Sequence, residues 1–142
     1  MIWILFSTCL RQSYQMAESL YLDAAEKGQY QAYCNLGYIY YYGRTGEPDY
    51  KKAFECFNRG VLLASDGNCY YKLGDMYRKG LYVEKDPALA FQLYLQAGRC
   101  EQTYQQEYLS GDPFGNEKKN IRHLTHLLSR LFQELAAAET AK

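Results

Sequence analysis

The chain has 142 residues, a length typical of one domain. Its 16 Lys and Arg balance its 16 Asp and Glu, and this neutrality gives no support for nucleic-acid binding or electrostatic docking on a membrane. The five cysteines form no CxxC pair and are odd in number, so at least one cannot join an intrachain disulfide, and a reducing compartment is favoured. We therefore expect a cytoplasmic protein, with a periplasmic or secreted location as the alternative.

The N-terminal segment is apolar from Met1 to Leu10. It is too short to span a bilayer. It also lacks the basic start of a signal peptide, because its positive charge, Arg11, follows the apolar run. We expect a capping helix or the remnant of a lost first helix. The alternatives are a partial or cleaved signal peptide and truncation of a longer array.

One pattern occurs twice along the chain, at a constant offset of 37 residues. The matching positions are Leu36, Gly37, Tyr40, Gly43, Asp49, Ala53, Phe54 and Phe57 in the first copy, and Leu73, Gly74, Tyr77, Gly80, Asp86, Ala90, Phe91 and Tyr94 in the second. A period of about 20 to 50 residues is the signature of a stacked-repeat architecture. Such proteins build an extended surface from similar units and usually hold a partner.

Each copy predicts a pair of helices. The first helix is expected at about 31–42, and again at about 68–79, because apolar residues recur there at helical spacing. The residues expected to end the first helix and to cap the second are Gly43 with Asp49, and Gly80 with Asp86. A glycine inside a helix costs roughly 1 kcal/mol relative to alanine, so Gly37 and Gly74 predict that another helix approaches closely.

The pattern resembles the Sel-one-like repeat, a relative of the tetratricopeptide repeat. The family's motif stands here as Ala32, Leu36-Gly37, Tyr40, Gly43, Asp49, Lys52-Ala53 and Phe57, and again as Leu73-Gly74, Tyr77, Gly80, Val83, Asp86, Ala90 and Tyr94. In the second copy Cys69 replaces the small alanine, and Tyr82 replaces a common loop glycine. The resemblance implies full repeats at 31–60 and 68–98. It also implies a partial repeat at 16–28 and a degenerate half repeat at 99–111.

A last helix is predicted at 117–138, after a loop signal from Asp112 to Asn116. We expect it to cap the array, whose final apolar face would otherwise be bare. The alternative is that it docks on another chain, so we expect a monomer or a weak dimer through this helix. The fold class is therefore all-α: a single domain, built as a solenoid of helix-turn-helix repeats with a long C-terminal capping helix.

No catalytic constellation is recognisable. His123 and His126 lie three apart on the last predicted helix, but a zinc site needs at least three protein ligands, and no others stand nearby in sequence. The glycines form neither GxxxxGK nor GxGxxG, and no GxSxG motif occurs. We expect no enzyme activity, no catalytic residue, no metal and no cofactor.

A helical wheel predicts where a partner would bind. If Ala32 and Leu36 face the core, the opposite face of the first helix is left for other contacts. In the resembled family the first helices line the concave surface. That implies a groove of nine positions in three copies: Cys34, Tyr38, Tyr41, Tyr71, Asp75, Arg78, Gln102, Gln106 and Leu109. The tyrosines and Arg78 of this set should be at least partly exposed, because they lie opposite the core stripe on the wheel. Tyrosine and arginine are also enriched at binding hot spots.

The function that this surface predicts is that of a non-catalytic scaffold or adaptor. It would bind a peptide or a helix of a partner protein, and neither nucleic acid nor a membrane-spanning segment is expected. One alternative is a glycan- or peptidoglycan-binding module of the cell envelope with an aromatic groove. A hydrolase is a third hypothesis. The repeat alignment also requires Leu36 and Leu73 to be buried.

Overall fold

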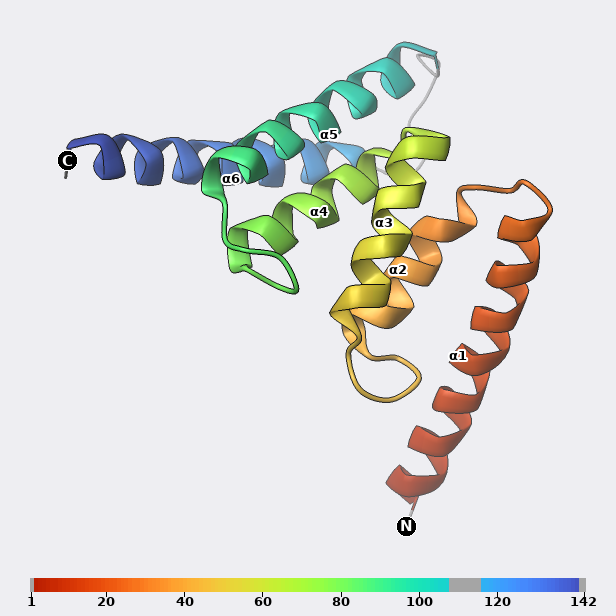
Figure 1. The fold of residues 1–142 in the computed structure, drawn as a ribbon. Coiled ribbons are helices and arrows are strands. Elements are labelled where there is room, and N and C mark those ends of the chain that lie inside the picture. Colours follow the sequence, from red (N-terminus) through yellow and green to blue (C-terminus); the bar gives the residue numbers. More distant parts are fainter. Residues whose placement is uncertain (1, 108–115, 141–142) are drawn as a thin grey trace. The chain divides into compact units, whose positions relative to one another are not determined.

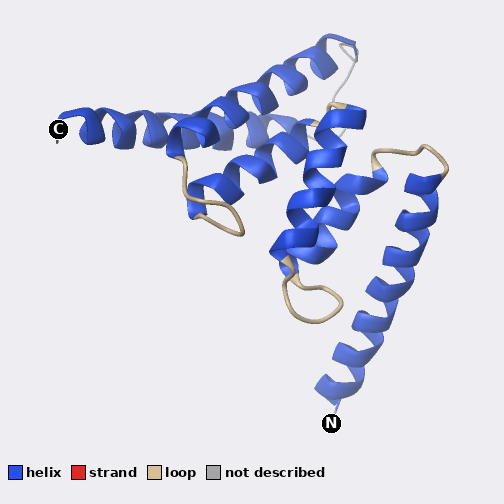
Figure 2. Cartoon of the chain, in the orientation of Figure 1, coloured by secondary structure: helices blue, strands red, loops and turns tan. Residues whose placement is uncertain are grey.

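The computed structural model describes the backbone of residues 2–107 and 116–140, and the side chains of 2–100, 126 and 128–140. This part of the chain consists of helices and connecting loops, without a strand (Figures 1 and 2). The helices are α1 (Ile2–Glu26), α2 (Ala32–Tyr42), α3 (Tyr50–Ala64), α4 (Gly67–Lys79), α5 (Pro87–Glu107) and α6 (Asn116–Thr140). The all-α prediction is confirmed. Residues 1–69 and 70–142 form two compact units.

The first repeat has the loop that its sequence predicts. Helix α2 ends at Gly43, whose φ of 62° lies in the left-handed region that glycine adopts without strain. The Asp49 carboxylate accepts a hydrogen bond from the Lys52 amide at 3.0 Å and so caps α3. The Asp49 amide donates to the Tyr40 carbonyl at 2.9 Å, which closes the loop. The predicted capping roles are therefore confirmed.

The second repeat, in residues 70–142, makes the same contacts. Gly80 has a φ of 70°. The Asp86 carboxylate accepts from the Leu89 amide at 3.0 Å, and the Asp86 amide donates to the Tyr77 carbonyl at 2.9 Å. One loop residue, Tyr82, takes a left-handed φ of 64° at the place where the resembled family commonly has glycine. Tyr82 therefore adopts a conformation that glycine reaches without strain.

The two mid-helix glycines each lie against an aromatic ring of the following helix. A Cβ atom on Gly37 would overlap the Phe57 ring of α3. A Cβ atom on Gly74 would lie 2.8 Å from the ring of Tyr94 on α5. Both helix pairs therefore approach closely because the first helix has no side chain at this point, as predicted.

The leucines that the two copies share lie in the core. Leu36 is 0% exposed and Leu73 is 3% exposed, so the repeat alignment is confirmed at both positions. On the second helix of the first repeat, Ala53 and Phe57 are fully buried. The apolar stripes that the sequence predicts are thus the stripes that face inward.

Helix α5 is longer than the sequence analysis predicts. It continues without a break through 99–107, where the half repeat at 99–111 implies a new first helix. The difference lies at the position that ends α3 in the first repeat. Helices α3 and α4 are separated by Ser65, which has a left-handed φ, and by Asp66, whose carboxylate caps α4. At the offset of 37 residues the place of Ser65 is taken by Gln102, which favours a helix.

Helix α6 packs on α5 within residues 70–142. Leu131 is buried in a cluster with Ala90, Tyr94 and Ala97, and Leu128 lies at its edge. The neighbouring Phe132 is exposed. Leu124 and Leu127 fall outside the described side chains. A cap would make contacts of this kind, and the capping role of the segment predicted at 117–138 stays a prediction.

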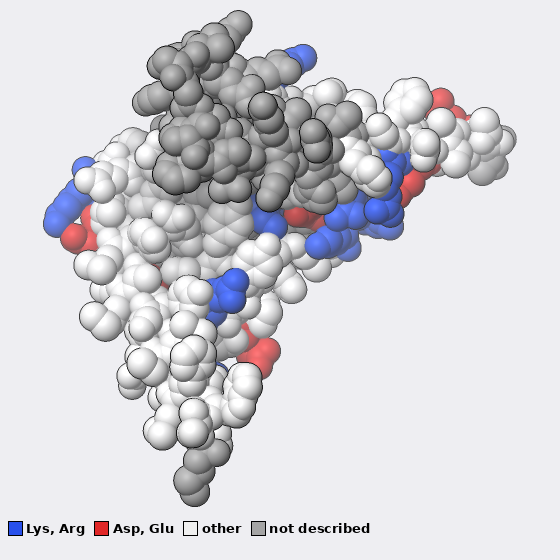
Figure 3. All heavy atoms as spheres, turned by 180° about the vertical axis from the view of Figure 1, so that it is seen from behind, with Lys and Arg blue, Asp and Glu red and all other residues white. Residues whose placement is uncertain are grey.

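Helix α1 begins well before the partial repeat at 16–28. Its first turns carry exposed apolar side chains, with Trp3 83% exposed and Phe6 65% exposed. In Figure 3 these turns lie just above the grey lower tip, in a region coloured white and not as Lys, Arg, Asp or Glu. Among the described residues, no helix is both long enough and apolar enough to cross a membrane.

Candidate functional site

The face of α2 that the wheel assigns to a partner is largely buried. Cys34 is 6% and Tyr41 is 7% exposed, while Tyr38 is half-buried. The Tyr41 ring meets the rings of Tyr50 and Phe57 edge to face, at centroid distances of 5.7 and 6.3 Å. The expectation that Tyr41 is exposed is therefore wrong. Helix α3 covers this face of α2, which is buried on two sides.

The equivalent face of α4 is closed around a carboxylate. Asp75 is buried, and its Oδ1 atom accepts a hydrogen bond from the Tyr94 hydroxyl at 2.5 Å. Lys72 Nζ lies 3.5 Å from Asp75 Oδ2, and Arg78 lies 3.6 Å from Oδ1. Burial and the hydrogen bond to Asp75 raise the pKa of Tyr94, so its hydroxyl keeps the proton that it donates. Asp75 is engaged inside the fold and is not an open groove residue.

The other predicted groove positions have different outcomes. Tyr71 and Arg78 are half-buried, which agrees with partial exposure. Both contact Tyr94: the Tyr71 ring at a centroid distance of 5.4 Å, and Arg78 through an Nε donor 3.2 Å from the hydroxyl. Gln102, Gln106 and Leu109 lie outside the side chains that the structure describes. A partner-binding role for this set stays a prediction.

The exposed face of α2 is rotated from the predicted one by roughly 60° on a wheel of 100° per residue. It carries the exposed residues Gln31, Asn35 and Tyr42 and the half-buried Tyr38, at the spacings of four, three and four residues that line one helical face. Tyr42 is 47% exposed. Tyr38 is thus the one predicted α2 residue that the exposed face retains.

The aromatic side chains on this face form an array with a cation. The Tyr38 and Tyr42 rings are parallel, with centroids 6.1 Å apart and an interplanar angle of 2°. The Arg44 guanidinium lies 5.2 Å from the Tyr42 centroid and 5.5 Å from the centroid of Tyr14 on α1. Arg44 therefore joins α1 and α2 by two cation–π contacts. We call Tyr14, Tyr38, Tyr42 and Arg44 the tyrosine–arginine array.

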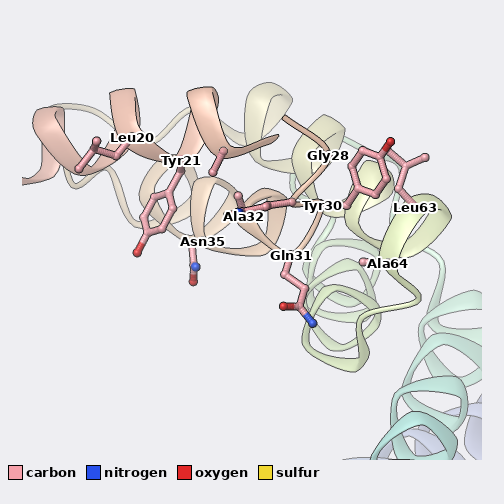
Figure 4. Close-up of a pocket in the computed structure, with 11 residues that line it drawn as sticks. Leu20, Tyr21, Gly28, Tyr30, Gln31, Ala32, Asn35, Leu63 and Ala64 are labelled. Carbon is pink, nitrogen blue, oxygen red and sulfur yellow. The ribbon is translucent and has the colours of Figure 1, made fainter. Parts of the chain in front are cut away.

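An open groove of about 690 Å³ lies along the same pair of helices (Figure 4). Its lining is Leu20, Tyr21, Ala24, Gly28, Gln29, Tyr30, Gln31, Ala32, Asn35, Leu63 and Ala64, none of which is charged. Figure 4 shows Tyr21 and Asn35 pointing to the same side. Tyr14 lies seven residues before Tyr21, and Tyr42 lies seven after Asn35, so each pair shares a helical face. The groove and the array therefore lie on one side of the α1–α2 pair.

Comparison with known families identifies the repeats. Residues 31–64 and 67–101 match the family model of the Sel1 repeat. The chain is a Sel1-like repeat protein. The two Sel1 repeats correspond to α2 with α3, and to α4 with most of α5. No curated protein and no solved structure matches the chain. Sel1 repeats generally mediate protein–protein interactions and are typically non-catalytic scaffolds.

The Sel1 motif as a whole does not predict the array. One residue of the motif, Gly37, does indicate which face of α2 is exposed. Gly37 marks a second buried face on α2, because the Phe57 ring lies against it. A wheel drawn with both Ala32 and Gly37 inside leaves Asn35 and Tyr42 outside. The contact between Arg44 and Tyr14 has no such signal, since it depends on how α1 packs against α2.

The described side chains include potential metal ligands. His126 is exposed, and His123 falls outside that set. One group converges in residues 1–69: the ligand atoms of Cys34, Asp66 and Cys69 lie within 4.8 Å of one another. The motif spacing does not predict this group, because Cys34 lies far along the chain from Asp66 and Cys69.

Proposed function

We propose that this Sel1-repeat protein binds a peptide segment or a helix of a partner protein along the α1–α2 surface, which comprises the tyrosine–arginine array and the adjoining groove. The observation that carries the proposal is the array. It presents aromatic rings and a guanidinium on one continuous face. Tyrosine and arginine are the residue types that dominate binding energy when a partner covers them.

The groove adds the chemistry that a polypeptide needs. The amides of Gln29, Gln31 and Asn35 can both donate to and accept from peptide groups. Leu20 and Leu63 are exposed at its walls and offer apolar area to a side chain of the partner. Because the groove is uncharged and Arg44 lies along the same face, the bound segment should be neutral in the groove, with an acidic residue near Arg44.

The test is a selection of displayed peptides on the intact chain, followed by binding measurements on variants. Tyr42→Ala and Arg44→Ala should each weaken a selected peptide by more than about 2 kcal/mol, which is roughly 30-fold in Kd. Tyr82→Ala is the matched control, because Tyr82 is also an exposed tyrosine but belongs to the other compact unit. Its Kd should not change.

Two results would overturn the proposal. Peptides that bind Tyr42→Ala and Arg44→Ala as tightly as the parent chain would move the site elsewhere. A chain that selects no peptide but binds oligosaccharides, with the same two variants defective, would make the surface a glycan site. Circular dichroism of each variant shows whether the fold is intact before its Kd is interpreted.

A further inference from the structure

Three side chains with metal-binding atoms converge between α2 and the start of α4. Cys34 lies on α2, Asp66 precedes α4, and Cys69 lies in the first turn of α4. Their ligand atoms, two sulfurs and a carboxylate oxygen, lie within 4.8 Å of one another. Both cysteines are buried and Asp66 is half-buried, so the group is open to solvent only on the carboxylate side.

The Cys69 sulfur occupies a place that the neighbouring helix leaves free for it. A Cβ atom on Gly60 of α3 would overlap the Cys69 sulfur. At the offset of 37 residues Gly60 corresponds to Ala97, and Cys69 itself stands where the first repeat has Ala32. In the first compact unit the larger Cys69 on α4 therefore packs on the smaller Gly60 of α3. This packing leaves room for the thiol.

The carboxylate is oriented in advance. Asp66 Oδ1 accepts hydrogen bonds from the Asn68 amide at 2.8 Å and the Cys69 amide at 3.4 Å, as an N-capping residue does. A ligand held by such bonds loses little freedom when it coordinates a cation. Within the described part of the chain its second oxygen accepts no hydrogen bond, which leaves it available to a cation.

We propose that Cys34, Asp66 and Cys69 form a binding site for a thiophilic divalent cation of the Zn²⁺ type. Zinc takes Cys and Asp ligands, and three protein ligands leave a fourth position for water. With Zn–S bonds of about 2.3 Å, the two sulfurs of a tetrahedral site lie about 3.8 Å apart. The ligand atoms lie within 4.8 Å of one another, which is close to that spacing.

A metal suits this group better than thiol reactivity does. Cys69 is fully buried, so its sulfur is shielded from oxidants and other reagents in solution. A bound cation supplies the positive charge that replaces the two thiol protons, which leave to solvent as the metal binds.

The test is a titration of the full chain with Co²⁺, a spectroscopic probe for Zn²⁺, in the presence of a reductant that contains no thiol. One equivalent should produce a thiolate-to-cobalt charge-transfer band, and Zn²⁺ should abolish it. The band should be lost in Cys34→Ser and in Cys69→Ser. Asp66→Asn keeps a good capping residue but removes the charged oxygen, so affinity should fall by about 10- to 100-fold.

Cys56→Ser is the matched control, because Cys56 is a half-buried thiol of the same unit outside the group of three. Its titration should equal that of the parent chain. X-ray absorption of the zinc-loaded parent chain gives a readout that needs no variant, and should show two sulfur ligands at about 2.3 Å with lighter atoms beside them. Absence of a band, its survival in Cys34→Ser, or a different sulfur count would overturn the proposal.

Discussion

The two Sel1 repeats close equivalent faces with different chemistry. In the first repeat, the Tyr38 ring of α2 meets the Phe57 ring of α3 edge to face, at a centroid distance of 5.8 Å. At the equivalent positions of the second repeat, Asp75 of α4 accepts a hydrogen bond from the Tyr94 hydroxyl of α5. A buried tyrosine hydroxyl needs a partner. Tyr94 has a hydroxyl that Phe57 lacks, and Asp75 supplies the acceptor for it where the first repeat has Tyr38.

The difference extends to the neighbouring position. Tyr41 packs on Phe57, whereas Arg78 at the same place of the second repeat donates to Tyr94. The backbone contacts that define the repeat stay the same, because Gly37 and Gly74 both let a ring lie against the helix. In both repeats the ring therefore lies at the same position, while the groups that surround it are aromatic in one repeat and charged in the other. We expect the aromatic version to tolerate truncation and the ionic version to be sensitive to it.

Asp75→Ala should have the largest effect on this comparison. It removes the buried carboxylate that faces Lys72 and Arg78, and breaking one partner of a buried ion pair costs about 3–5 kcal/mol. Tyr38→Ala at the equivalent position removes part of a half-buried ring and should cost about 2 kcal/mol. Urea unfolding followed by circular dichroism measures both. Equal costs at the two positions would show that the ionic cluster is no more sensitive than the aromatic one.

The sequence predicted the backbone of the repeats better than their surfaces. Gly43 and Asp49 act locally, within a few residues, so a motif is enough to assign their roles. Tyr41 was misplaced because the wheel assumed one buried face, whereas a helix in a stacked pair is buried on two. The predicted exposed face of α2 could have been corrected from Gly37, which marks the second buried face.

Other features depend on packing between distant segments. Arg44 meets Tyr14 only because α1 runs beside α2, and no local pattern encodes that register. Cys34 and Cys69 are likewise brought together by the way α3 and the start of α4 follow α2. The half repeat at 99–111 was divided from its predecessor by analogy with the family, while Gln102, which favours a helix, stands at the position where Ser65 ends α3.

Leu36→Ala and Leu73→Ala test whether the two repeats share one core despite their different faces. Both leucines are buried at equivalent positions, so each truncation should destabilise by about 2–5 kcal/mol. The two costs should be similar. Chemical denaturation of both variants under the same conditions provides the comparison. A cost at one site less than half of that at the other would mean that the repeats are packed unequally.

Exchanging the rings sharpens the comparison further. Tyr94→Phe leaves the buried Asp75 without its hydroxyl donor and should cost about 1–3 kcal/mol. Phe57→Tyr introduces a hydroxyl where no carboxylate stands, and overpacking there should cost about 1–3 kcal/mol as well. Thermal unfolding of the two single variants tests this. A stabilised Phe57→Tyr would show that the first repeat already holds an acceptor for the hydroxyl.

Alkaline pH should weaken the second repeat through Tyr94. Burial and the hydrogen bond to Asp75 raise the pKa of this tyrosine in the folded state. Its contribution is fully present below about pH 10, where an unfolded tyrosine ionises, and is lost as pH rises further. The slope for this one group is at most about 1.4 kcal/mol per pH unit. Tyr94→Phe should show a shallower slope than the parent chain in unfolding measurements on both sides of that pH. Burial also raises the pKa of Tyr38, so part of the slope should remain.

The smallest effects are expected at the left-handed residues that are not glycine, one in each compact unit. Ser65 ends α3 with a φ of 50°, and Tyr82 lies in the loop after α4 with a φ of 64°. This conformation costs a residue with a side chain about 1–2 kcal/mol, whereas glycine adopts it freely but gains entropy in the unfolded chain. Ser65→Gly and Tyr82→Gly should therefore each stabilise by at most about 1 kcal/mol. Tyr82→Gly should gain less, because it also removes the contacts of the ring.

Gly43→Ala is the control with the opposite sign, since its Cβ atom would lie 2.6 Å from the Pro48 nitrogen. Differential scanning calorimetry resolves such shifts, and a destabilised Ser65→Gly would mean that the serine side chain holds the end of α3 by a contact of its own.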